Sequence, residues 1–260
     1  MRLFYFCIFA KKQKEMIDSV RSTVLTILNK NNYGVITPAD FNLLAKKAQL
    51  EVVEDIMFRR NRAVNEENAR VSGTGVSDKT RELAEDLERL VVFENQLTQN
   101  GTSQSKYFLP SISTTQDVLY SLQNVLCYDD SGFVGEAEKV DYRDLVRLRM
   151  ADLTPPTSKY PVYVVSGDSI HVFPETYNSA NSVKATYIRH PRDPKWTYIN
   201  ILGGAPVFDQ TINDYQDFEV PEKYHDSLVV KILKDCGVVI REAEIANYAA
   251  TEEAEDQQVN

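Results

Sequence analysis

Three histidines, His171, His190 and His225, are the residues in this sequence best suited to acid–base or metal chemistry near neutral pH. They occur singly, on an expected strand, at the edge of an expected loop and on an expected helix. A zinc site needs several ligands that converge, and the sequence holds no HExxH, CxxC or GxSxG pattern and no phosphate-binding GxxxxGK loop. We therefore expect no catalytic, cofactor-binding or metal-binding residue, and we interpret each histidine as a surface or hydrogen-bonded side chain.

Paired carboxylates are the second route to chemistry, and the candidates are Asp129, Asp130 and Glu136. A glycoside hydrolase needs two carboxylates that face each other across a cleft, and no spacing in this sequence specifies such a pair. The stretch Asp129–Gly132 also departs from the alternating acidic pattern of a calcium loop, and it predicts a hairpin turn instead. A hydrolase stays open as an alternative function.

Length and composition bound the class of protein. The 260 residues are 43% hydrophobic and 26% charged, which is typical of a soluble globular chain. A net charge of −9 argues against a dedicated DNA- or RNA-binding protein, because such proteins normally carry a basic surface. The cysteines, Cys7, Cys127 and Cys236, are far apart and odd in number. They indicate neither a disulfide framework nor a zinc site, so the chain is expected to fold in a reducing interior.

The apolar run Leu3–Ala10 near the N-terminus meets a group of lysines directly after it. It is far shorter than the ~20 apolar residues of a membrane span, so no membrane partner is expected. The run is interpreted as a strand or helix turn that packs on this protein or on a neighbour, with a targeting signal as the alternative.

Helical periodicity dominates the first hundred residues. A helix is expected over Met16–Leu28, with Ile17, Val20, Val24 and Ile27 or Leu28 on its apolar face. A second begins with Thr37 as its N-cap and Pro38 in its first turn. A third is expected after Ser77. The buried face of the second helix is expected to consist of apolar residues at helical spacing, namely Phe41, Ala45, Ala48, Val52 and Ile56.

Short β-branched and aromatic runs follow, separated by turn residues. One hairpin is expected around 120–128 and 132–140, and another joins "KYPVYVV" to "SIHVFP" through Ser166–Asp168; "SVKATYI" is a further strand. A short helix is expected over Tyr142–Met150 with Asp141 as its cap. A final helix begins near Pro221, with Leu228, Ile232 and Leu233 on its apolar face.

These elements predict an α+β fold in which N-terminal and C-terminal helices form one bundle around an inserted β-rich module, sandwich-like or barrel-like. The expected parts are a helical region over 1–104, the β-rich insertion over 105–218, a C-terminal helix over 219–250 that packs on the N-terminal helices, and an acidic disordered tail over 251–260.

The most unusual stretch is "IRHPRDPKWTYINILGGAPVFD", which contains the single tryptophan between prolines and basic residues. The prolines stiffen the chain and cannot donate to a sheet, so the stretch is suited to docking on another protein surface. The alternative is that the tryptophan fills a groove between the β-rich region and the C-terminal helix. The candidate subunit-interface residues here are Arg189, Pro191, Arg192, Pro194, Trp196 and Tyr198.

Charge is distributed unevenly along the chain. Residues 1–72 carry 12 Lys and Arg against 8 Asp and Glu, whereas residues 215–260 carry 4 against 11. Opposite charges on the two parts favour a protomer that meets its neighbours through complementary surfaces. Arg59, Arg60 and Arg62 form a basic run that could contact phosphate but is more typical of a solvated face or a partner contact, and they are further interface candidates.

Two regions carry a resemblance to a known class of proteins. The stretch "ITPADFNLLAKKAQLEVVEDI" resembles the first long helix of tailed-bacteriophage structural proteins. The run "IHVFPETYNSANSVKATYIRHPRDPKWTYI", followed by "DFEVPEKYHDSLVVKILKDCGVVIREAEIANYA", is similar to the C-terminal half of connector proteins of short-tailed phages. The resemblance covers about residues 33–250 and is closest to ring (adaptor) proteins of crAss-like phages, more loosely to tubular tail proteins.

The resemblance implies a virion structural protein of the head-to-tail connector or tail. Such a protein forms a homo-oligomeric ring, usually of twelve copies, that contacts the portal and other neck or tail rings and continues the DNA channel without sequence-specific binding. It needs no cofactor, and it is located in the virion after assembly in the host cytoplasm. The apolar N-terminal run and the acidic tail depart from the family pattern. The alternatives are a tail-associated hydrolase and a protein-binding module that uses the Trp196 stretch.

Overall fold

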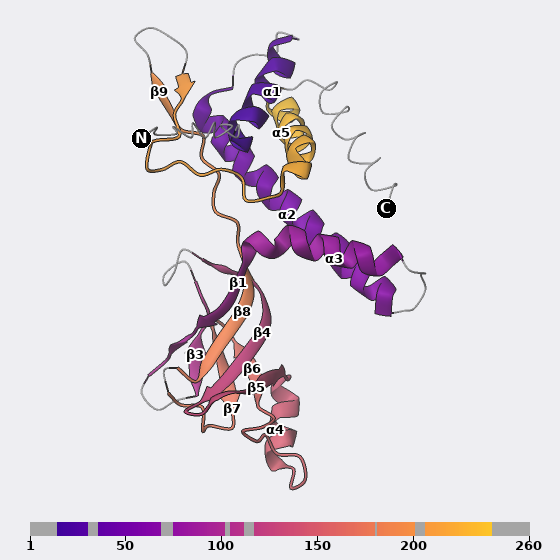
Figure 1. The fold of residues 1–260 in the computed structure, drawn as a ribbon, viewed down its shortest axis with the longest axis vertical. Coiled ribbons are helices and arrows are strands. Elements are labelled where there is room, and N and C mark those ends of the chain that lie inside the picture. Colours follow the sequence, from indigo (N-terminus) through magenta and orange to yellow (C-terminus); the bar gives the residue numbers. More distant parts are fainter. Residues whose placement is uncertain are drawn as a thin grey trace, which may run out of the picture. The chain divides into compact units, whose positions relative to one another are not determined.

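The computed structural model describes residues 15–30, 36–68, 75–101, 105–111, 117–179, 181–200 and 206–240. They form two compact units (Figure 1). Unit 1 comprises the described residues of Met1–Asp86 and Pro191–Asn260, and unit 2 is Leu87–His190. Unit 1 is mainly helical and unit 2 is built on a large sheet, so the expected α+β class with a barrel-like β module is confirmed.

The boundaries of the β-rich part differ from the expected 105–218. The first strand already begins at Val91, and the chain leaves the β-rich unit at His190. Residues 191–218 therefore belong to the helical unit. Several of their backbone groups bond one another, as in the pairs Lys195–Gln216 and Thr197–Asp209, and others bond side chains of α2. We call residues 191–224 the return segment. The N-terminal apolar run, residues 241–250 of the expected last helix and the acidic tail lie outside the described residues.

Unit 1 is organised around four helices. They are α1 (Met16–Lys30), α2 (Pro38–Asn68), α3 (Gly75–Leu87) and α5 (His225–Ile240), the last preceded by the short helix η2 (Glu222–Tyr224). Helix α2 starts as expected, since the backbone N–H of Asp40 donates to the Thr37 hydroxyl at 3.2 Å. Helix α5 packs against both α1 and α2 (Figure 1).

The apolar faces expected for these helices are confirmed as buried. Burial of a Leu, Ile or Phe side chain contributes ~1.5–3 kcal/mol relative to exposure, so this shared core is the main source of stability in unit 1. Its buried side chains include Ile17, Val20, Val24 and Leu28 of α1, Phe41, Ala45, Ala48, Val52 and Ile56 of α2, and Leu228, Ile232 and Leu233 of α5.

Unit 2 contains an eight-stranded sheet in the order β1-β8-β4-β5-β6-β7-β3-β2. Its neighbours are antiparallel except β5 and β6, which run parallel and are joined through helix α4 (Tyr142–Met150). The strands are β1 (Val91–Gln96), β2 (Thr98–Gln99), β3 (Lys106–Phe108), β4 (Leu119–Asp129), β5 (Gly132–Lys139), β6 (Val162–Ser166), β7 (Ser169–Phe173) and β8 (Val183–Arg189).

The two edge strands of this sheet are consecutive in the chain. Only Leu97 separates β1 from β2, yet β1 pairs with β8 and β2 pairs with β3 at the other edge. One short stretch of chain thus brings both edges together, and the sheet is nearly closed into a barrel. Closure matters physically because an open edge leaves backbone N–H and C=O groups unpaired.

Both expected hairpins are confirmed. Strands β4 and β5 pair across the turn after Asp129, whose carboxylate accepts a 2.8 Å hydrogen bond from the Ser131 N–H. Strands β6 and β7 pair across Gly167, which has a φ of 58° that favours glycine.

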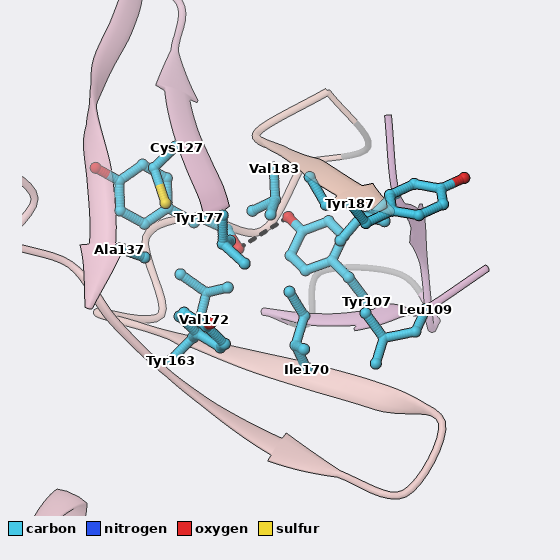
Figure 2. Packing of buried hydrophobic residues seen from close by; sticks show 13 residues of the cluster. Tyr107, Leu109, Cys127, Ala137, Tyr163, Ile170, Val172, Tyr177, Val183 and Tyr187 are labelled. Atoms are coloured by element: carbon cyan, nitrogen blue, oxygen red, sulfur yellow. Dashed lines mark hydrogen bonds between the residues drawn. The ribbon is translucent and has the colours of Figure 1, made fainter. Parts of the chain in front are cut away.

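Alternate residues of the strands fill the barrel interior, where four tyrosines are buried (Figure 2). The Tyr107 hydroxyl reaches the backbone carbonyl of Tyr177 at 3.1 Å and that of Ser179 at 2.9 Å, so its polar end is satisfied. The remaining core side chains are Leu97, Leu109, Val125, Cys127, Ala137, Tyr163, Ile170, Val172, Tyr177, Val183, Ala185 and Tyr187.

Helix α4 covers the outer face of β6 through a single buried side chain. Leu145 packs with Val162 and Val164, which point away from the barrel interior. The helix spans the expected residues, but Asp141 makes no capping hydrogen bond with its side chain. Most of α4 is therefore exposed to solvent.

The two described cysteines lie in the cores of different units, and burial raises the pKa of the Cys127 and Cys236 thiols to about 12. At pH 8 only about 10⁻⁴ of each is then thiolate, the reactive form. We expect both to resist iodoacetamide in a folded Cys7→Ser variant at pH 8 and to react fully in urea. Labelling followed by peptide mass spectrometry measures this; fast labelling of Cys127 in the native protein would contradict the buried position.

Candidate interaction surface

The return segment is held against α2 by two amide side chains. The Trp196 N–H donates to Asn42 Oδ1 at 2.8 Å, and Asn42 Nδ2 donates to the Trp196 carbonyl at 3.2 Å. The buried Gln49 acts in the same way, donating to the Arg192 carbonyl at 2.8 Å and accepting from the Glu219 N–H at 2.9 Å. Asn42 and Gln49 are seven residues apart, about two helical turns, so they share one face of α2.

The return segment in turn fixes the start of α1. The carboxylate of Asp217 accepts from the backbone N–H groups of Met16 at 3.1 Å and Ile17 at 2.8 Å. The first N–H groups of a helix have no partner within the helix, and a negative charge there interacts favourably with the helix dipole. Residues about 200 positions apart therefore form the N-terminal cap of α1.

Trp196 is buried inside unit 1, with only 2% of its surface exposed. Its indole N–H donates to Asp18 at 3.1 Å, and the guanidinium carbon of Arg21 lies 3.8 Å from the ring centroid. Burial, the largest influence, lowers the pKa of Arg21, while the Asp18 charge acts in the opposite direction. The Trp196 ring is also stacked with the rings of Tyr198 and Phe208, at centroid distances of 5.6 and 5.9 Å.

The expectation that Trp196 is an exposed docking anchor is therefore wrong. The alternative, a tryptophan packed inside the protein, agrees with its burial, and its hydrogen-bond and ring partners come from α1, α2 and the hairpin that follows it. The neighbouring helices provide the hydrogen-bond partners of the buried residue, namely Asn42 of α2 and Asp18 of α1.

The hairpin consists of β9 (Tyr198–Asn200) and β10 (Pro206–Phe208). Tyr198 lies opposite Phe208, and Ile199 lies opposite Val207. Because successive strand residues point to opposite faces, the first pair meets Trp196 and the second faces away from it. Ile199 is 47% exposed and Val207 44% exposed. The hairpin thus has one face bound to the helical unit and an apolar pair on the other face.

Among the described residues, β9 and β10 pair only with each other. A two-stranded ribbon is marginal by itself, and here its base is closed by hydrogen bonds between Thr197 and Asp209, including a 3.0 Å bond from the Asp209 N–H. The hairpin is therefore a preorganised element with an uncovered apolar face.

The other interface candidates are spread over both units. Arg189 belongs to unit 2 and is buried beside Asp117, with Nε 3.5 Å from the carboxylate. Pro194 is buried, Pro191 is half-buried, Arg192 is exposed, and Tyr198 is partly exposed at the hairpin. On α2, Arg62 pairs with Glu66 at 3.0 Å, while Arg59 and Arg60 are half-buried.

The side chains considered for catalysis are distributed over both units. His171 and His190 lie in unit 2, whereas His225 lies in unit 1 beside Ser19. Asp129 stands opposite Gly132 and Glu136 opposite Leu126 on the same hairpin, so their backbone positions are separated by roughly 10 Å along the strand. Over the described ranges, no three His, Cys, Asp or Glu side chains are arranged to hold a metal ion.

Sequence reasoning missed Asn42, Gln49, Asp217, Ile199 and Val207. The two amides lie on a helix rich in polar residues, where nothing distinguishes a buried amide from a solvated one. The signal for the hairpin was present, because "YINILGGAPVF" places two apolar stretches around a glycine pair.

No protein-family model matches the chain, and no curated protein matches it. No helix within the described part of the chain combines the length and apolar character that crossing a membrane requires.

Replacing Trp196 by alanine is expected to destabilise the monomer itself by ~3–5 kcal/mol, the usual range for a large aromatic removed from a core. Thermal and urea unfolding followed by circular dichroism measure this. Tyr160→Ala, at an exposed aromatic of unit 2, is the control and should leave the midpoint nearly unchanged. An unaltered Trp196→Ala midpoint would be inconsistent with the burial described.

Gln49→Leu keeps the side chain's size but leaves the Arg192 carbonyl and the Glu219 N–H without their partner. Each unsatisfied buried group costs ~1–3 kcal/mol, so the free energy of unfolding should fall by at least about that much. Urea titration measures the loss, with Gln210→Leu at an exposed position as the matched control. Equal stability of the two variants would show that Gln49 does not hold the return segment.

Proposed function

We propose that the protein is a virion structural protein, a subunit of a homo-oligomeric ring in the portal, neck or tail of a tailed phage. The observation that carries the proposal is the β9–β10 hairpin. It places the apolar pair Ile199 and Val207 outward on an element whose other face is fixed to the helices.

Preorganisation is what makes this hairpin suited to assembly. Ordering a loop at an interface costs free energy on binding, and an element already held in place avoids that cost. The aromatic stack around Trp196 and the Thr197–Asp209 bonds hold the hairpin in the free subunit. Binding then gains from covering the two apolar side chains without first ordering the ribbon.

The sequence resemblance supports the ring and its location. Proteins of that kind stack under the portal, usually as twelve copies, and extend the DNA channel. The net charge of −9 agrees with a channel that passes DNA, because an attractive lumen would hold phosphates and retard the genome. On this proposal the protein is not an enzyme and requires no cofactor; its partners are other copies, the portal and adjacent rings.

The test is the mass of the assembled particle by native mass spectrometry, with negative-stain imaging for shape. The wild-type chain should form closed rings. Ile199→Asp combined with Val207→Asp should give monomers with an unchanged melting temperature, because both side chains are already exposed in the single chain. A charge placed in an apolar interface centre is strongly unfavourable.

Val165→Asp is the matched control, since Val165 of β6 is exposed to a similar degree at 43%. It should assemble like the wild type. A wild-type chain that stays monomeric at every concentration tested would count against the ring, and normal rings from the double aspartate variant would count against the hairpin as the contact.

A further inference from the structure

Helix α4 presents apolar residues to solvent. Tyr142, Val146 and Met150 recur at intervals of four, and they are 78%, 46% and 79% exposed. Leu153, just after the helix, is 95% exposed. The solvent side of an amphipathic helix normally carries polar residues, and the side that packs on the sheet is provided by Leu145. We call Tyr142, Val146, Met150 and Leu153 the α4 face.

Basic residues accompany the α4 face. Residues 142–150 contain Arg143, Arg147 and Arg149 against Asp144, and Asp141 and Asp152 flank the helix. The Arg147 guanidinium is 3.4 Å from Asp144, and the Arg149 guanidinium is 3.8 Å from Glu175. The helix itself therefore combines uncovered apolar area with three arginines, which fits a partner that carries both carboxylates and apolar side chains.

The chain itself contains a segment of that chemistry. Residues 241–260, "REAEIANYAATEEAEDQQVN", hold six Asp and Glu against one Arg, together with Ile245 and Tyr248. The segment has 20 residues, so fully extended it spans up to ~66–72 Å. It begins directly after α5, in a different unit from α4.

We propose that the α4 face binds residues 241–260 of a neighbouring copy. The proposal rests on the proposed homo-oligomer, in which two different complementary surfaces of one chain make a head-to-tail contact that repeats around the assembly. Ile245 and Tyr248 would cover the apolar residues of the α4 face, and the surrounding carboxylates would face its arginines.

The test places the photo-cross-linker p-benzoyl-phenylalanine at position 150 of the full-length protein, which is then irradiated. A contact between copies joins two chains of 29.6 kDa, so a species of twice that mass should appear on a denaturing gel. Trypsin cuts after Arg241 and releases residues 242–260 as one peptide. Mass spectrometry of the dimer band should show this peptide linked to the one that contains position 150.

The matched control carries the same cross-linker at position 93, since Phe93 of β1 is an exposed aromatic of the same unit. It should not label residues 242–260. Arg143→Glu combined with Arg147→Glu should reduce the position-150 yield several-fold, whereas Lys106→Glu should not. Raising the salt from about 0.1 M to 1 M shortens the Debye length from ~10 Å to ~3 Å and should also lower the yield.

The outcomes separate this inference from the proposed function. If native mass spectrometry shows rings but the cross-linker at position 150 joins a peptide other than 242–260, the inference is overturned and the proposed function stands. A cross-link to peptide 242–260 that is found only in the band of a single chain also overturns the inference, because the segment would then bind α4 of its own copy. Monomers without any dimer band overturn both proposals.

Discussion

The fold depends on one constraint: a chain that leaves the helical unit after α3 has to be fixed again when it returns a hundred residues later. Asn42 and Gln49 meet this requirement by giving backbone groups of the return segment the partners that a sheet would otherwise provide. A satisfied hydrogen bond contributes only about 0.5–1.5 kcal/mol, but an orphaned buried group costs more. The positions of Asp217 at the start of α1 and of Trp196 beneath the hairpin follow from this attachment.

The two units use polar groups in different ways. In the barrel, tyrosines span the apolar interior and place their hydroxyls at backbone carbonyls, so a hydrogen bond accompanies a large buried surface. In the helical unit, amides and carboxylates connect segments far apart in sequence. Both solutions satisfy polar groups inside the units, while apolar side chains stay exposed on the surface, including those of the β9–β10 hairpin and the α4 face.

The spacing of apolar residues predicted most helices and strands. Which of the two units each segment belongs to became clear only from the structure. Helical spacing predicted the buried faces of α1, α2 and α5, and Tyr142–Met150 was placed to the residue. The early start of the sheet was missed because Leu87, Leu90 and Val91 continue a helical spacing up to the point where β1 begins. Trp196 was misassigned because proline and charge predict a stiff segment but not which side of it faces the helices. Long-range partners such as Gln49 leave no local signal.

Where the β-rich unit begins and ends has a consequence for how such a protein can change over time. Its first and last strands are hydrogen-bonded neighbours, with Val91 opposite Ile188, and the Arg189 side chain bonds the Arg89 carbonyl at 3.4 Å. The points at which the chain enters and leaves the β-rich unit therefore lie side by side. Their spacing is set by this pairing and not by the length of the chain between them. Loops of the barrel can lengthen, shrink or be exchanged for those of another module while the ends stay in register. Sequence changes in the loops of the β-rich unit therefore need not disturb the helical unit, and these loops can change to bind a different partner.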